Sequence, residues 1–175
     1  MFETPMYDTA NKALSSAGEL GLAADRFRQV GPREWRSVLS RIFDAFVNTS
    51  DSGVTWLWSH LKRDSVAVQV EDGLREISSM VSPDTAAWLL LEDWDGTKER
   101  GNYWVFEGDY SAIIAVLGNM HLIEYYIVDR KCTWMILENH HGALIGVGDL
   151  VESFIRNLIK AEPAPLPSYP RFPSE

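Results

Sequence analysis

Two adjacent histidines, His140 and His141, are the side chains of this sequence best suited to metal or acid–base chemistry. Imidazole binds transition metals and titrates near neutral pH, and Glu138 and Asn139 directly precede the pair. Neighbouring side chains of a strand point to opposite faces, so the two rings could chelate one ion only from a turn. We therefore expect no metal and no cofactor, and interpret these four residues as a polar strand end that hydrogen-bonds locally or contacts a partner.

A second polar cluster, the densest acidic one, follows an apolar run. Its members are Glu92, Asp93, Trp94, Asp95 and Glu99. Such carboxylates could bind a divalent cation, but the calcium-loop spacing is absent, and a lone EDWD has little specificity for acid–base catalysis. Carboxylates around an exposed tryptophan are also typical of a protein interface. We favour the interface over a merely solvated turn.

Cys132 is the only cysteine, so no intrachain disulfide can form. Arg130 and Lys131 precede it and could lower the pKa of its thiol, but no Cys–His signature accompanies it. Gly142, Gly146 and Gly148 lack the helix-opening context of a phosphate loop. The sequence thus favours a protein that is not an enzyme.

The formal net charge is −9, and it is unevenly distributed. Residues 71–109 hold ten acidic and three basic residues and so carry most of the excess. Phosphate binding needs a basic face, so nucleic acid is not expected as a direct ligand. A basic protein partner is the natural complement, although an acidic face also serves solubility alone.

The elements that must position these residues are mainly strands. Tyr125–Val128, Trp134–Leu137 and Ala143–Val147 are rich in β-branched, aromatic and aliphatic residues, with turn-forming residues between them. They predict a three-stranded meander near the C-terminus. The run ending at Glu92 and the one starting at Tyr103 predict a hairpin, and Ser65–Val70 alternates as a strand does.

Helices are predicted around these strands. The clearest covers residues 33–47. Four others are predicted: one that ends near Ala17, one that begins near Leu22, one that spans Glu71–Val81 and one that ends at Gly118. A last helix follows Asp149 as its cap, and residues 54–61 fit either helix or strand. The fold class is therefore α+β: a mostly antiparallel sheet packed against several helices.

At 175 residues with 46% hydrophobic content, the chain suits one domain, which we place at residues 1–160. Residues 161–175 are a proline-rich tail, either extended and free or lying along the domain. No apolar run is long enough to span a membrane and no standard export signal begins the sequence. We expect a cytoplasmic protein.

The segments WLLLEDWD, YWVFEG and EYYIVDRKCTWMILENHHGALIGVG, with the closing amphipathic helix, resemble the SUKH-like immunity proteins of bacterial polymorphic toxin systems. The likeness covers about residues 54–160. Its anchors are the strand at Trp88–Asp93, which begins with a tryptophan and ends in acids, and the hairpin from Trp134 to Gly148. A related small bacterial α+β family fits the same segments.

The resemblance implies a cytosolic, non-enzymatic protein that blocks a cognate toxin. Charge supports this separately, because a nuclease toxin is basic where it holds its substrate and an acidic inhibitor can imitate that substrate. Two alternatives stay open: a chaperone or adaptor for a secreted effector, and a small enzyme that uses the histidines and a carboxylate.

Overall fold

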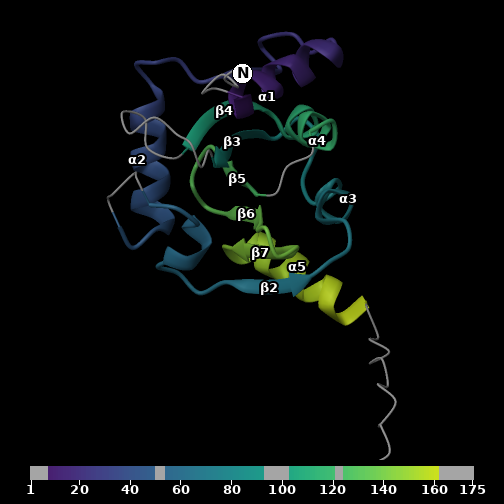
Figure 1. Ribbon diagram of the computed structural model, residues 1–175. Helices are drawn as coiled ribbons and strands as arrows, with labels where there is room; N and C mark the ends of the chain where they lie inside the picture. Colours follow the sequence, from purple (N-terminus) through teal and green to yellow (C-terminus); the bar gives the residue numbers. More distant parts are fainter. Residues whose placement is uncertain (1–7, 50–53, 93–102, 121–123, 162–175) are drawn as a thin grey trace, which may run out of the picture.

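The computed structural model describes residues 8–49, 54–92, 103–120 and 124–161, which form an α+β fold (Figure 1). The described strands are β1 (Phe27–Gln29), β2 (Val66–Gln69), β3 (Ala86–Glu92), β4 (Tyr103–Asp109), β5 (Tyr125–Asp129), β6 (Met135–Glu138) and β7 (Ala143–Val147). The described helices are α1 (Asp8–Glu19), α2 (Trp35–Phe46), α3 (Gly73–Ile77), α4 (Tyr110–Gly118) and α5 (Asp149–Ala161), with a 3₁₀ turn, η1 (Leu57–His60).

The seven strands form one antiparallel sheet in the order β1-β4-β3-β5-β6-β7-β2. Strands β5, β6 and β7 are the predicted meander, and β3 with β4 is the predicted hairpin. The two strands at the edges are short, as expected for edges that must not pair with another chain.

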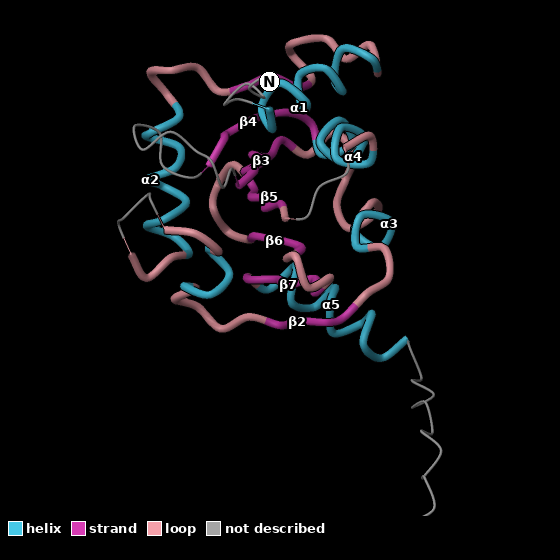
Figure 2. Tube along the Cα trace, viewed as in Figure 1, coloured by secondary structure: helices cyan, strands magenta, loops and turns pink. Residues whose placement is uncertain are grey.

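Helices cover both faces of the sheet. Helix α2 and η1 lie on one side, whereas α1, α3, α4 and α5 lie on the other (Figures 1 and 2). Strand β3 shows how its side chains divide: Trp88 and Leu90 face α2, while Leu89 and Leu91 face the four-helix side. Burial on both faces explains why β3 reads as a continuous apolar run and not as an alternating one.

Arginines cover the Trp88 ring at its outer side. The guanidinium carbons of Arg41 and Arg130 lie 5.0 and 4.7 Å from the ring centroid. Arg130 also pairs with Glu107, and Arg41 donates a hydrogen bond to the carbonyl of Arg130 at 3.1 Å. These contacts join α2 to the turn between β5 and β6.

The predicted helix beginning near Leu22 is wrong, because residues 27–29 form β1 and pair with β4. Phe27 stacks on Phe106 with ring centroids 5.4 Å apart, so long-range packing outweighs the weak local pattern. Helix α3 is also shorter than predicted, and residues 57–60 form the 3₁₀ turn η1. None of the described helices is long and apolar enough to cross a membrane.

Candidate functional site

The antiparallel register brings several polar strand ends to one end of the sheet. Glu92, the last residue of β3, is paired with Tyr103 of β4, and Tyr125 at the start of β5 is paired with Glu138 at the end of β6. Glu92 therefore lies near Glu124, which precedes β5, and near the β6–β7 turn. Glu92, Glu124 and His140 together are called the carboxyl–histidine cluster below.

Glu92 is buried, with 7% of its surface exposed. Its carboxyl oxygens accept hydrogen bonds from the backbone N–H of Trp56, at 3.1 and 3.2 Å. Burial, together with a hydrogen bond to Glu124 and the like charge of Glu124, raises the pKa of Glu92 to about 8. Glu92 therefore keeps its proton at neutral pH.

Glu124 is the centre of the cluster and is buried, with 6% of its surface exposed. The hydroxyl of Tyr126 donates to one carboxyl oxygen, and Nε1 of Trp58 donates to the other at 3.3 Å. Nδ1 of His140 lies 3.0 Å from that second oxygen. Glu124 thus joins the sheet, the segment around η1 and the β6–β7 turn.

Aromatic rings surround His140. The ring centroids of His141, Trp56 and Trp58 lie 4.1, 5.7 and 5.9 Å from that of His140. Trp56 is 37% exposed and adopts a left-handed backbone conformation with φ of 54°, which is strained for a tryptophan. The bonds from its N–H to Glu92 hold this conformation and leave the indole ring at the surface.

Tyr103 places a further polar atom beside the pair. Its side chain is 3% exposed, and its hydroxyl makes no hydrogen bond of regular geometry with the described residues. The hydroxyl lies close enough to Glu92 to lower the pKa of that carboxyl slightly, while burial raises the pKa of Tyr103 itself. A neutral donor next to a carboxyl pair suits either proton transfer or the binding of a polar group.

The sequence matches the family described as "Family of unknown function (DUF6756)" over residues 10–159. The chain belongs to this family. Among curated proteins and solved structures, no match to the chain was found.

The structure of this DUF6756 protein unites some of the predicted contact residues and separates others. His140 and Glu92, predicted as parts of two surfaces, belong to one cluster, and His141 is exposed beside them. Glu138 lies on the opposite face, where the Tyr125 hydroxyl donates to its carboxylate at 2.9 Å. Asp93, Trp94, Asp95 and Glu99 lie outside the described residues.

Asn139 is 5% exposed and serves the β6–β7 turn directly. Its side-chain oxygen accepts hydrogen bonds from the N–H groups of His141 and Ala143, each at 3.0 Å. Its side chain therefore presents little surface to a partner. Its structural role is to fix the backbone that carries both histidines.

We expect the Asn139→Ala substitution to destabilise the DUF6756 protein by about 1–2 kcal/mol, because two turn N–H groups lose their acceptor. Denaturant unfolding would measure this change. Asn119→Ala is the matched control, since Asn119 is exposed and, among the described residues, its amide donates only to the exposed Glu19. Equal stabilities of the two variants would contradict the role of Asn139 in the turn.

The central residue Glu124 was not among the residues that the sequence predicted as contacts. One signal was present: Glu124 lies directly before an apolar strand, and two residues before Tyr126, so both share a face. Its proximity to Glu92 depends on the pairing of β3 with β5, which no local pattern specifies.

The structure also bears on metal binding and on the reactivity of Cys132. Within the described ranges, no group of three or more His, Cys, Asp or Glu side chains could hold a metal ion. Burial raises the pKa of the Cys132 thiol, and the nearby Arg41 offsets this only in part. A thiol with a raised pKa is a poor nucleophile at neutral pH.

Proposed function

We propose that this protein is a non-enzymatic binding protein. It binds a basic protein partner at the end of the sheet where the carboxyl–histidine cluster lies. The observation that carries the proposal is the junction at Glu124, which joins the two predicted contact segments. The end of β3, where the acidic stretch from Asp93 begins, and the turn bearing His140 thereby form one surface. An aromatic ring exposed beside carboxylates, as Trp56 is, is a common anchor at interfaces.

The most specific form of the proposal is an immunity protein that neutralises a secreted bacterial toxin in the cytoplasm. The net charge of −9 complements a toxin that is basic where it holds nucleic acid. Charge complementarity also speeds the encounter, which matters for a protein that must capture a toxin before it acts.

Co-expression with a toxin domain from a gene adjacent to its own would test this proposal. We expect the chain to restore growth and to bind the purified toxin with an affinity that falls as salt rises. If the chain neither protects against such a toxin nor binds it, the immunity function is contradicted. Binding without protection would instead indicate a chaperone or adaptor.

We expect charge reversal at Asp93 and Asp95, to lysine, to weaken toxin binding at least about tenfold in titration calorimetry, since like charges would then face each other. The matched control reverses Asp25 and Asp44, two exposed acids elsewhere in the chain. Unchanged affinity of the Asp93/Asp95 variant, or equal losses in both variants, would argue against the acidic surface.

A small enzyme is the second candidate, because Glu92 retains a proton near neutral pH beside Glu124, whose carboxylate also contacts His140. The two candidates differ in the expected effect of Glu92→Gln, which keeps the shape of the protonated acid but cannot transfer its proton. A binding protein should still neutralise the toxin with this variant. Loss of neutralisation at unchanged toxin affinity would favour an enzyme acting on the toxin.

A further inference from the structure

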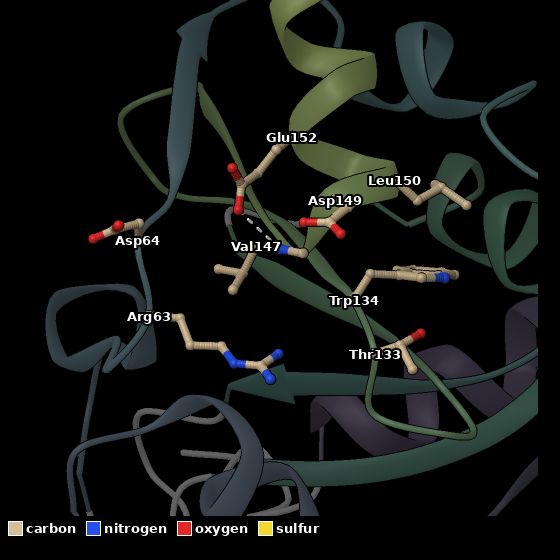
Figure 3. Close-up of a pocket in the computed structure, with 9 residues that line it drawn as sticks. Arg63, Asp64, Thr133, Trp134, Val147, Asp149, Leu150 and Glu152 are labelled. Carbon is tan, nitrogen blue, oxygen red and sulfur yellow. Dashed lines mark hydrogen bonds between the residues drawn. The ribbon is translucent and has the colours of Figure 1, made fainter.

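A cavity of about 570 Å³ lies at the other end of β6 and β7, away from the carboxyl–histidine cluster (Figure 3). It is formed where Val147 ends β7, where Thr133 and Trp134 lead into β6, and where Arg63 precedes β2. Its other lining residues are Asp64, Gly148, Asp149, Leu150 and Glu152. No residue of the proposed partner surface belongs to it.

Arg63 supplies the positive charge of the cavity. Its guanidinium points into the space in front of Val147 (Figure 3), and its carbon lies 5.5 Å from the ring centroid of Phe46. Across the described part of the chain, Arg63 has no ion pair. A guanidinium ordered by an aromatic ring, with its N–H groups free, is well suited to bind a carboxylate.

Asp149, the first residue of α5, supplies a free negative charge. Its carboxylate is directed toward the same space (Figure 3), and it makes neither an ion pair nor a side-chain hydrogen bond with the residues the structure describes. Glu152 differs, because it accepts a hydrogen bond from the N–H of Gly148 at 3.2 Å and pairs with Arg156. Asp64 also lines the cavity, but its carboxylate points away from the other lining side chains (Figure 3), so Asp149 is the carboxylate that remains for an ammonium group.

Apolar surface completes the cavity. Leu150 is 46% exposed at the rim and Trp134 keeps 5% of its surface exposed, while Val147 is fully buried beneath the floor. A ligand that matches all three parts carries an anionic group, a cationic group and an aliphatic body. The volume lies within the range typical of small-molecule sites.

We propose that this cavity binds a free α-amino acid with an aliphatic side chain. Arg63 holds its carboxylate, Asp149 holds its ammonium group, and Leu150 and the exposed part of Trp134 contact its side chain. The site lies apart from the partner surface and does not depend on the proposed function.

Titration of the full chain with L-leucine, N-acetyl-leucine and leucine amide tests the proposal by calorimetry. We expect saturable binding of leucine with a Kd of about 1 mM or tighter. Each derivative lacks one of the two charges and should bind at least about tenfold more weakly. The proposal is overturned if leucine does not bind saturably, or if either derivative binds as tightly as leucine.

Two substitutions assign the charges. Arg63→Gln and Asp149→Asn should each weaken leucine binding at least about tenfold, and each should leave toxin binding unchanged. Arg36→Gln is the matched control, because Arg36 is likewise an exposed arginine over an aromatic ring of α2, 5.2 Å from the centroid of Trp35. Leucine affinities unchanged in both cavity variants would overturn the assignment, and thermal unfolding would verify that both are folded.

Discussion

Raising the pH from about 5 to about 9 is expected to destabilise this protein by about 2 kcal/mol more than it destabilises the Glu92→Gln variant. The folded-state pKa of Glu92, about 8, lies above its ordinary value of 4.5. Between these two values the unfolded chain releases the proton while the folded chain retains it. The stabilising contribution of the neutral carboxyl is therefore complete below about pH 4.5 and is lost as the pH rises to about 8.

Glutamine imitates the protonated acid, because its amide can accept from the N–H of Trp56 and donate to Glu124. The variant should match the native protein at pH 5 and exceed it at pH 9, with a melting temperature about 4–8 °C higher. Thermal unfolding at both pH values measures the difference. The matched control is Glu71→Gln, which removes an exposed carboxylate and should leave the pH dependence unaltered.

An identical pH dependence in the native protein and in Glu92→Gln would contradict the raised pKa of Glu92. This outcome would also remove the main support for the enzyme alternative. It would leave the docking proposal intact, because that proposal rests on the arrangement of the surface and not on the titration of Glu92.

Gly148→Ala is expected to destabilise the protein by about 3 kcal/mol or more. Gly148 has a φ of 98°, which side chains rarely tolerate, and an added Cβ would lie 2.4 Å from the carbonyl oxygen of Thr133 and 3.0 Å from Cα of Trp134. The close approach of these two backbone segments sets where α5 begins after β7. A methyl group there must displace one of them.

Denaturant unfolding measures this cost, with Gly118→Ala as the control. Gly118 ends α4 without a positive φ, and a Cβ added to it would meet nothing within 4 Å. That substitution should be neutral or stabilising by about 0.5 kcal/mol, since alanine has less freedom to lose on folding. A loss below about 1 kcal/mol for Gly148→Ala would show that the turn can rearrange. If the turn rearranges in this way, leucine binding should weaken, because Gly148 lines the cavity.

Local sequence patterns were sufficient for most of the strands and for the fold class. The meander from Tyr125 to Val147 was predictable because β-branched and aromatic runs alternated with turn residues, and β3 because its apolar run ends abruptly at Glu92. Helix α2 was predictable because its apolar residues recur at three- and four-residue steps. These signals are short-range, so they survive without knowledge of the neighbours.

Strand β1 shows where local patterns fail. Three residues carry too little periodicity to outweigh the helical pattern around them, and their conformation is decided by pairing with β4 and by the stacking of Phe27 on Phe106. The predicted contact residues show the same limit. Alternation alone would place Glu138 and His140, two residues apart, on the same face, and it is the turn at Asn139 that brings them to opposite faces.

By itself, the sequence determined that the chain folds as an antiparallel sheet with helices, and that its acidic charge is concentrated in residues 71–109. Only the tertiary structure decided that Glu92, Glu124 and His140 meet, and that Arg63 and Asp149 face one cavity. The physical reason is that burial and the distance between charges depend on the pairing of strands far apart in the sequence. The pKa of Glu92 follows from that pairing, and no neighbour in the sequence encodes it.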